Sequence, residues 1–189
     1  RLCVIKKIQI ELIIFIILLA NVFLSYKADL LIYDFFYNLN YGLGAPYLKN
    51  FFIKVTELGD SLWYFLITFL MFIISFVGRI VKIIPSRLCF FLRNLSIFSF
   101  VYLSFVGIAA QILKHIIGRP RPNHADFEKG FDFNFFSTDA SFHSFPSGHS
   151  STIFAVTLIM ILLVPRLKLF FLFFGFVIAL SRVVVGAHF

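Results

Sequence analysis

The sequence has little charge for its length. Charged residues make up 14% of its 189 positions, against about 25% in ordinary soluble domains. So few charges cannot cover the surface of a soluble globule of this size, which excludes an ordinary cytosolic enzyme. Hydrophobic residues reach 60% and the mean hydropathy is +0.96, which excludes a disordered chain. The basic residues are too diluted in Phe and Ile for a nucleic-acid-binding protein. An integral membrane protein is the remaining class.

Cysteine is also scarce. Cys3 and Cys89 are isolated and have no metal-ligand spacing, so the sequence does not support a disulfide framework. No internal repeat or low-complexity linker divides the chain, and we treat residues 1–189 as a single transmembrane domain. The sequence begins with Arg1 and stops inside an apolar run, so we expect it to be a fragment that is truncated at its C-terminal end.

Five segments are long and apolar enough to cross a bilayer, which takes about 20 residues. They cover residues 8–26, 61–78, 95–113, 148–164 and 168–184. The last two are near the short limit, and a tight turn at 165–167 joins them into an antiparallel hairpin. Helices are expected because an open sheet edge in lipid leaves backbone groups unpaired. The predicted fold is an all-α, polytopic transmembrane helical bundle with five spans, and a sixth span is expected beyond the end.

Two features near the N-terminus leave alternatives open. Lys6 and Lys7 before the first apolar segment are also typical of a cleavable signal peptide, but no clear cleavage site follows. Residues 27–60 mix Asp and Tyr with Leu and Phe, and glycines and a proline at 42–46 divide them. We expect one or two short helices in the membrane interface. The alternative is a lid over a lipid-entry groove.

The distribution of charge predicts the orientation. The formal net charge is +8. With a cytoplasmic N-terminus, nine of the 17 basic residues and one of the nine acidic residues lie inside, and the outer side is neutral in sum. We expect residues 79–93 to form a short loop, and this loop decides the orientation because it has four basic residues and no acid. Residues 114–145 and those after 184 are then expected to face the periplasm or exterior from a bacterial inner (plasma) membrane.

Three polar clusters lie at the outward ends of the last three predicted spans. They are Lys114 to Pro122, which includes Arg119 and Arg121; Pro146 to His149; and Ser181 to His188, which includes Arg182. Each alone is typical of a helix end, where cations reach toward headgroups and Ser caps the helix. Together they gather cations and two histidines, which indicates a site for an anion with several oxygens. The N-terminus of the fourth span adds free N–H groups and a positive dipole end.

In this order and spacing, the clusters resemble the three signature motifs of the type 2 phosphatidic acid phosphatase family. That family is part of the acid phosphatase and vanadium haloperoxidase superfamily, and the resemblance, to its membrane-embedded branch, covers residues 114–188. The six-residue gap after Lys114 selects Arg121 rather than Arg119. The family's third motif continues with an aspartate four residues after its histidine, which is a position beyond Phe189.

The resemblance implies a role for each matching residue. His188 would attack phosphorus to form a phosphohistidine, while His149 would protonate the leaving oxygen and then help to activate water. The non-bridging oxygens would be held by Lys114, Arg121, Ser147, the backbone N–H of Gly148, and Arg182. Because cationic side chains neutralise the phosphate, we expect no metal and no cofactor. His124 and His143 are expected to be bystanders.

The predicted function is hydrolysis of a lipid phosphomonoester or pyrophosphate, of the lipid A, undecaprenyl pyrophosphate or phosphatidylglycerol phosphate type. The residues between His149 and Ser181 allow about 23 Å for each crossing, less than the ~30 Å hydrocarbon core, so the motifs are expected at the headgroup level. The expected partners are the lipid phosphate and the bilayer, with no nucleic acid, and the oligomeric state stays open. Two alternatives remain, a lipid phosphotransferase with the same site and a non-catalytic lipid-binding membrane protein.

Overall fold

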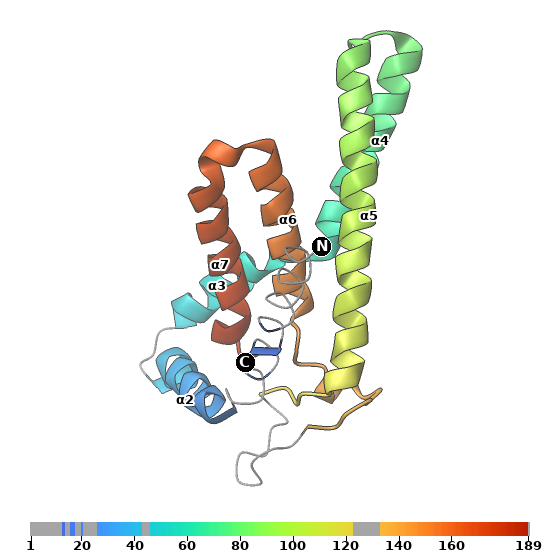
Figure 1. Ribbon diagram of the computed structural model, residues 1–189. Helices are drawn as coiled ribbons and strands as arrows, with labels where there is room; N and C mark the ends of the chain where they lie inside the picture. The colour runs from blue at the N-terminus through green and yellow to red at the C-terminus, as the bar shows by residue number, and fades with distance from the viewer. Residues whose placement is uncertain are drawn as a thin grey trace.

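The computed structural model of the protein is helical (Figure 1). It describes residues 13, 16–17, 20, 26–42, 46–122 and 133–188. Within these residues there is no β-strand, which confirms the all-α prediction. The first predicted span, 8–26, lies largely outside the described residues.

The four other predicted spans are helices. They are α4 (Ser61–Val81), α5 (Ser86–Ile117), α6 (Gly148–Leu163) and α7 (Lys168–Val184). Three helical stretches are long and apolar enough to cross a membrane: 47–81, which includes α4, then α5, and 165–184, which includes α7. The shorter α6 is also apolar. A 3-10 turn, η3 (Pro165–Leu167), joins α6 to α7, so the predicted hairpin is confirmed.

The basic segment 79–93, which we expected to be a loop, is mostly helical. The helix α4 continues to Val81 and ends where Lys82 takes a left-handed conformation with φ 59°. The next helix begins directly after Pro85, and proline is tolerated at the start of a helix. The prediction of a short loop over 79–93 was wrong for most of its residues, because Arg and Leu are good helix formers and charge alone does not end a helix. At about 1.5 Å per residue, α5 is about 48 Å long and exceeds the ~30 Å hydrocarbon core.

Short helices precede the spans, as the pattern of residues 27–60 predicts. They are α2 (Tyr26–Tyr37), the π-helical turn η1 (Asn38–Gly42) and α3 (Pro46–Glu57). Both α2 and α3 contact α7. They therefore lie against the helix that leads into the third polar cluster, and their place in the membrane interface stays a prediction.

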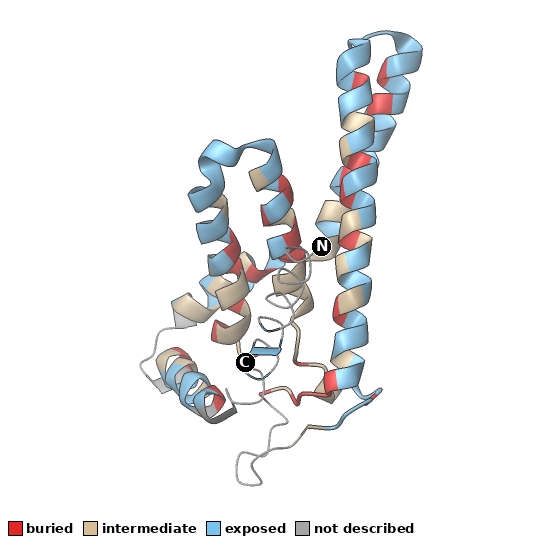
Figure 2. Ribbon diagram, viewed as in Figure 1, coloured by how far each residue is buried: buried red, intermediate tan, exposed pale blue. Residues whose placement is uncertain are grey.

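The described helices form two hairpins, α4–α5 and α6–α7, that meet through α5 and α6 (Figure 1). Leu103, Ala155 and Ile159 form the core of this contact. In the other hairpin, a Cβ on Gly175 would lie 2.6 Å from Thr157 Oγ1, so only glycine allows this close approach of α6 and α7. Most outward faces are exposed and apolar (Figure 2), as expected of surfaces that contact lipid. The C-terminal ends of α5 and α7 and the N-terminal end of α6 lie at one end of the bundle.

Candidate active site

The first polar cluster is shaped by a sharp turn at the end of α5. Gly118 has φ +57° and its N–H donates to Lys114 O at 3.0 Å, which caps the helix. A Cβ at Gly118 would lie 1.6 Å from Asn134 O, so a side chain has no space there. The turn leaves Lys114 in the last helical turn and sends the following residues across the end of the bundle.

Hydrogen bonds between two loop segments join the first cluster to the second. Arg121 N–H donates to Ser141 O at 2.8 Å, and Ser144 N–H donates to Arg119 O at 3.0 Å. These bonds hold residues 141–144 alongside residues 119–121. The chain that leads into Pro146 is therefore held beside the arginines of the first cluster.

The second cluster forms the N-terminus of α6. Ser147 is the N-cap, and its hydroxyl accepts a hydrogen bond from Ser150 N–H at 3.4 Å. A Cβ on Gly148 would lie 3.6 Å from Lys114 Nζ, so the ammonium group lies close to the first residue of the helix. A cation beside the positive end of a helix is unfavourable unless an anion lies between them. The arrangement therefore favours an anion at this point.

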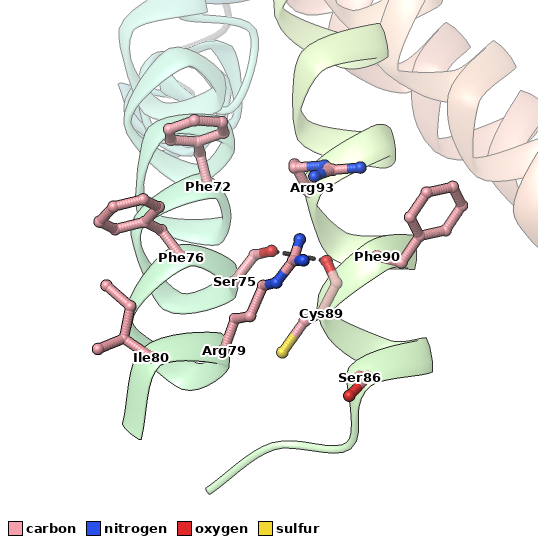
Figure 3. A pocket seen from close by; sticks show the side chains of 9 residues that line it. All are labelled: Phe72, Ser75, Phe76, Arg79, Ile80, Ser86, Cys89, Phe90 and Arg93. Atoms are coloured by element: carbon pink, nitrogen blue, oxygen red, sulfur yellow. Dashed lines mark hydrogen bonds between the residues drawn. The ribbon is translucent and has the colours of Figure 1, made fainter. Parts of the chain in front are cut away.

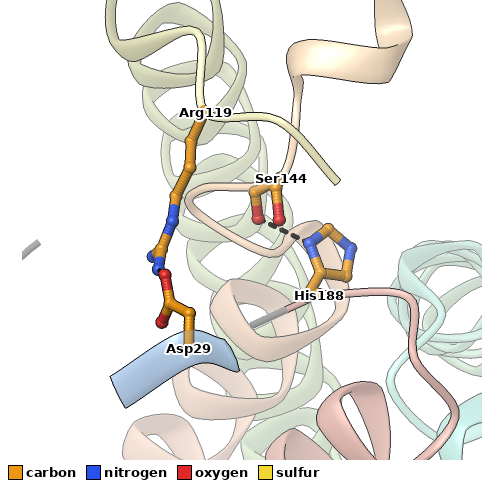
Figure 4. A network of polar contacts seen from close by, with 4 residues as sticks. All are labelled: Asp29, Arg119, Ser144 and His188. Atoms are coloured by element: carbon orange, nitrogen blue, oxygen red, sulfur yellow. Dashed lines mark hydrogen bonds and ion pairs between the residues drawn. The ribbon is translucent and has the colours of Figure 1, made fainter. Parts of the chain in front are cut away.

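His188, at the end of the third cluster, is buried with 5% exposure. Its Nδ1 lies 2.5 Å from Ser144 O (Figure 4). A carbonyl oxygen only accepts, so Nδ1 carries the proton and Nε2 keeps its lone pair. The backbone of Ser144, two residues before the second cluster, thus sets the tautomer that a nucleophilic histidine requires.

The surroundings of His188 favour its neutral form. The pKa of His188 is lowered from 6.5 to about 3, mainly by burial, and the positive charges of Arg182, Arg121 and Lys114 contribute to this shift. The hydrogen bond to Ser144 acts in the opposite direction. His188 is therefore uncharged at neutral pH, in the form that has a free lone pair. These charge interactions also mean that cations from two different clusters surround this ring.

The seven residues that the sequence singles out are gathered at one end of the bundle. The charges of Arg182 and Lys114 also act on His149, which is next to Gly148. The Nε atoms of Arg121 and Arg182 are buried and have no hydrogen-bond partner among the described residues. Burying a guanidinium donor without a partner costs more than about 1–3 kcal/mol. A phosphate oxygen would pair with such donors.

Arg119, which the motif spacing separates from Arg121, is engaged elsewhere. It forms a buried ion pair with Asp29 of α2 (Figure 4). This pair connects the N-terminal helices to the turn of the first cluster. Asp29 could not be predicted as the partner of Arg119, because the two residues are 90 positions apart in the sequence.

Sequence reasoning also missed two polar residues that hold the third cluster. Asn40 Nδ2 donates to Val184 O at 2.7 Å, at the end of α7. One terminal nitrogen of Arg182 donates to Thr56 Oγ1 at 3.1 Å. Asn40 and Thr56 are both buried. In the sequence, each of them is recognisable only as a polar residue in an apolar segment. This does not predict which residue it contacts.

The predicted absence of a metal stays a prediction. In the part of the chain that the structure describes, no group of three or more His, Cys, Asp or Glu side chains is arranged to hold a metal ion. The polar groups that gather instead are cations and the neutral imidazole of His188, which suit an anionic ligand.

The fold and the site define this protein as a helical membrane protein. Its site is cationic, contains two histidines and lies at one end of the bundle. The family model of the PAP2 superfamily matches residues 95–189. The chain therefore belongs to the PAP2 superfamily, and the family resemblance of its three motifs is confirmed.

Two curated relatives match a longer stretch. The chain is 36% identical over 137 residues to a lipid A 1-phosphatase of Rhizobium etli, which covers 71% of this chain and 59% of the relative. It is 34% identical over 137 residues to a lipid A 1-phosphatase of Rhizobium johnstonii, which covers 71% of this chain and 56% of the relative. The match thus spans less than two thirds of either relative. No solved structure matches the chain.

Proposed function

We propose that the chain is the catalytic part of an integral membrane lipid phosphatase. It hydrolyses a lipid phosphomonoester or pyrophosphate at a site that faces away from the cytoplasm of a bacterial inner membrane. One observation carries the proposal: neutral His188, with Nε2 available, lies among three cations, two of which have a buried Nε with no partner among the described residues. Lipid A 1-phosphate is the first substrate to test, because both relatives are named for it.

The proposed reaction has two displacements on phosphorus. His188 Nε2 attacks, the bond from phosphorus to the leaving oxygen breaks, and His149 donates a proton to that oxygen. His149 then takes a proton from water, which attacks phosphorus, and the bond to His188 breaks with release of phosphate. The non-bridging oxygens are held by Lys114, Arg121, Ser147, the Gly148 N–H and Arg182. Catalysis is then mainly positioning and charge stabilisation by donors already in place.

A cavity beside His149 supports a lipid as the leaving group. It has a volume of about 260 Å³ and lies between α4, α5 and α6. His149 and Lys114 line it, as do the apolar Phe65, Leu103 and Gly107. The group that receives the proton from His149 would leave through this cavity, and its apolar part would contact the apolar lining.

Enlarging Gly107 tests this assignment. A Cβ on Gly107 meets no atom within 4 Å, so a larger side chain can extend into open space. In Gly107→Leu we expect the ratio of kcat/KM for a long-chain lipid phosphate to that for a short-chain analogue to fall by about tenfold. Gly107→Ala is the matched control and should change the ratio far less. An unchanged kcat/KM ratio in Gly107→Leu would mean that the lipid does not occupy this cavity.

Changing Thr56 tests how Arg182 is positioned. Thr56→Val keeps the shape of the side chain and removes the acceptor of the bond from Arg182, so we expect kcat/KM to fall about tenfold. Thr56→Ser restores the hydroxyl and should restore most of the activity. Thr68→Val is the matched control, because the Thr68 hydroxyl donates within α4, to Phe65 O at 2.9 Å. Equal losses in both valine variants would indicate general destabilisation.

The function itself is tested by phosphate release from a panel of lipids. The full-length protein in detergent is supplied with lipid A 1-phosphate, undecaprenyl pyrophosphate, phosphatidylglycerol phosphate and soluble sugar phosphates. We expect hydrolysis of at least one lipid and weak activity on the sugar phosphates. Preference for sugar phosphates would contradict the proposal. Transfer to a lipid acceptor instead of water would identify a phosphotransferase, and binding without turnover a lipid-binding protein.

A further inference from the structure

A second cavity lies at the other end of the α4–α5 hairpin from the candidate active site (Figures 1 and 3). Its volume is about 660 Å³. The side chains of Phe72, Phe76 and Phe90 and those of Arg79 and Arg93 line it. Aromatic walls and two guanidinium groups therefore share one space between two helices.

The floor of this cavity is fixed by contacts between the helices. Ser75 and Cys89 are 3% and 2% exposed, and Ser75 Oγ donates to Cys89 O at 2.6 Å. Beside them, Ile84 packs directly on Gly78, since a Cβ there would lie 2.6 Å from Ile84 Cδ1. These contacts hold α4 and α5 together below the cavity, so its two arginines are held by helices of fixed spacing.

The hairpin carries no counter-charge for these arginines. Residues 61–117 contain five Lys and Arg residues and no Asp or Glu. Among the described residues, the ion pair that the structure records is that of Arg119 with Asp29, and none involves Arg79 or Arg93. The Arg93 guanidinium lies 5.2 Å from the centroid of the Phe90 ring. An arginine beside lipid is costly when it has no acidic partner, and neither arginine has one among the described residues, which favours an anionic ligand here.

We propose that this cavity binds the headgroup of an anionic phospholipid, with its phosphate between Arg79 and Arg93. The guanidinium groups offer paired donors that match phosphate oxygens. Phe72 and Phe76 are 39% and 58% exposed, so the acyl chains can lie along them. A soluble anion would leave these walls uncovered, and a zwitterionic lipid would bring its own cation to the arginines. Basic pockets between membrane helices are suited to such headgroups.

The same end of the hairpin supplies a matched control. Lys82 and Arg87 lie in or beside the turn between α4 and α5, but they do not line the cavity. If the basic residues at this end are attracted to lipid headgroups in general, all four should contribute equally to lipid binding. If the cavity is a binding site, Arg79 and Arg93 should contribute far more than the other two.

The test titrates dioleoyl phosphatidylglycerol into the purified full chain in neutral detergent and measures the dissociation constant by native mass spectrometry. The double variant Arg79→Gln, Arg93→Gln should bind at least tenfold more weakly. The double variant Lys82→Gln, Arg87→Gln, which removes the same charge, should bind within twofold of the parent. Dioleoyl phosphatidylcholine and glycerol 1-phosphate should each bind at least tenfold more weakly than phosphatidylglycerol.

Several results would overturn the proposal. Equal losses in the two double variants would mean diffuse attraction to the hairpin, and no loss in either would place the lipid elsewhere. Equal binding of phosphatidylcholine would exclude an anionic headgroup, and equal binding of glycerol 1-phosphate would exclude the acyl chains. Arg79→Lys, Arg93→Lys keeps the charge and removes the guanidinium groups, so it should bind with intermediate strength and should fold like the parent. Phosphate release is not measured, so failure here leaves the proposed phosphatase untouched.

Discussion

Replacing His188 with alanine is expected to lower phosphate release by at least about 10⁴-fold, because the attacking atom is lost. The imidazole is buried, its Nδ1 is engaged by Ser144 O, and its lone pair is on Nε2. The cations around it remain in His188→Ala and still bind phosphate. Substrate binding should therefore survive while turnover does not, which separates a catalytic role from a structural one.

The covalent intermediate gives a second measurement for the same change. Rapid quenching of the parent protein with radiolabelled substrate should trap a phosphate that is stable in alkali and labile in acid, as expected of a phosphohistidine. The label should be absent from His188→Ala. His115→Ala is the matched control, because His115 is exposed on α5 and its Nδ1 lies 2.7 Å from Gln111 O. Near-parental phosphate release from His188→Ala would contradict the mechanism.

Hydropathy predicted the helices better than charge predicted their ends. The expected span 168–184 coincides with α7, and the expected turn at 165–167 coincides with η3. Local composition suffices there, because an apolar run and a proline determine both features. The segment 79–93 differs, since its arginines mark a change in polarity but lie inside α4 and α5. The point where a sequence becomes polar therefore does not have to be the point where a helix ends.

The site was predictable to the extent that its residues repeat a known spacing. Lys114, His149 and His188 were identified by motif, and they lie at the same end of the bundle. The groups that hold them were not predictable, because Thr56 and Asn40 meet their partners only when the chain has folded. The Ser144 carbonyl is still harder to foresee, since every residue has a carbonyl and only the fold selects this one.

Arg182 has one terminal nitrogen that donates to Thr56 Oγ1 at 3.1 Å and a buried Nε without a partner among the described residues, and this makes its replacement by lysine informative. A guanidinium group can be held at one nitrogen and still offer others to phosphate. The single ammonium nitrogen of lysine carries the same charge but cannot occupy both places.

We therefore expect Arg182→Lys to lower kcat/KM by at least about a hundredfold, similar to the loss of one preorganised donor in other enzymes. The measurement is phosphate release from the best lipid of the panel. Arg166→Lys is the matched control, because Arg166 is exposed in η3 at the far end of α7 and should stay within twofold of the parent. If Arg182→Lys keeps activity within threefold, the site needs only the charge. The bond to Thr56 would then have no part in positioning, and Thr56→Val should lose nothing either.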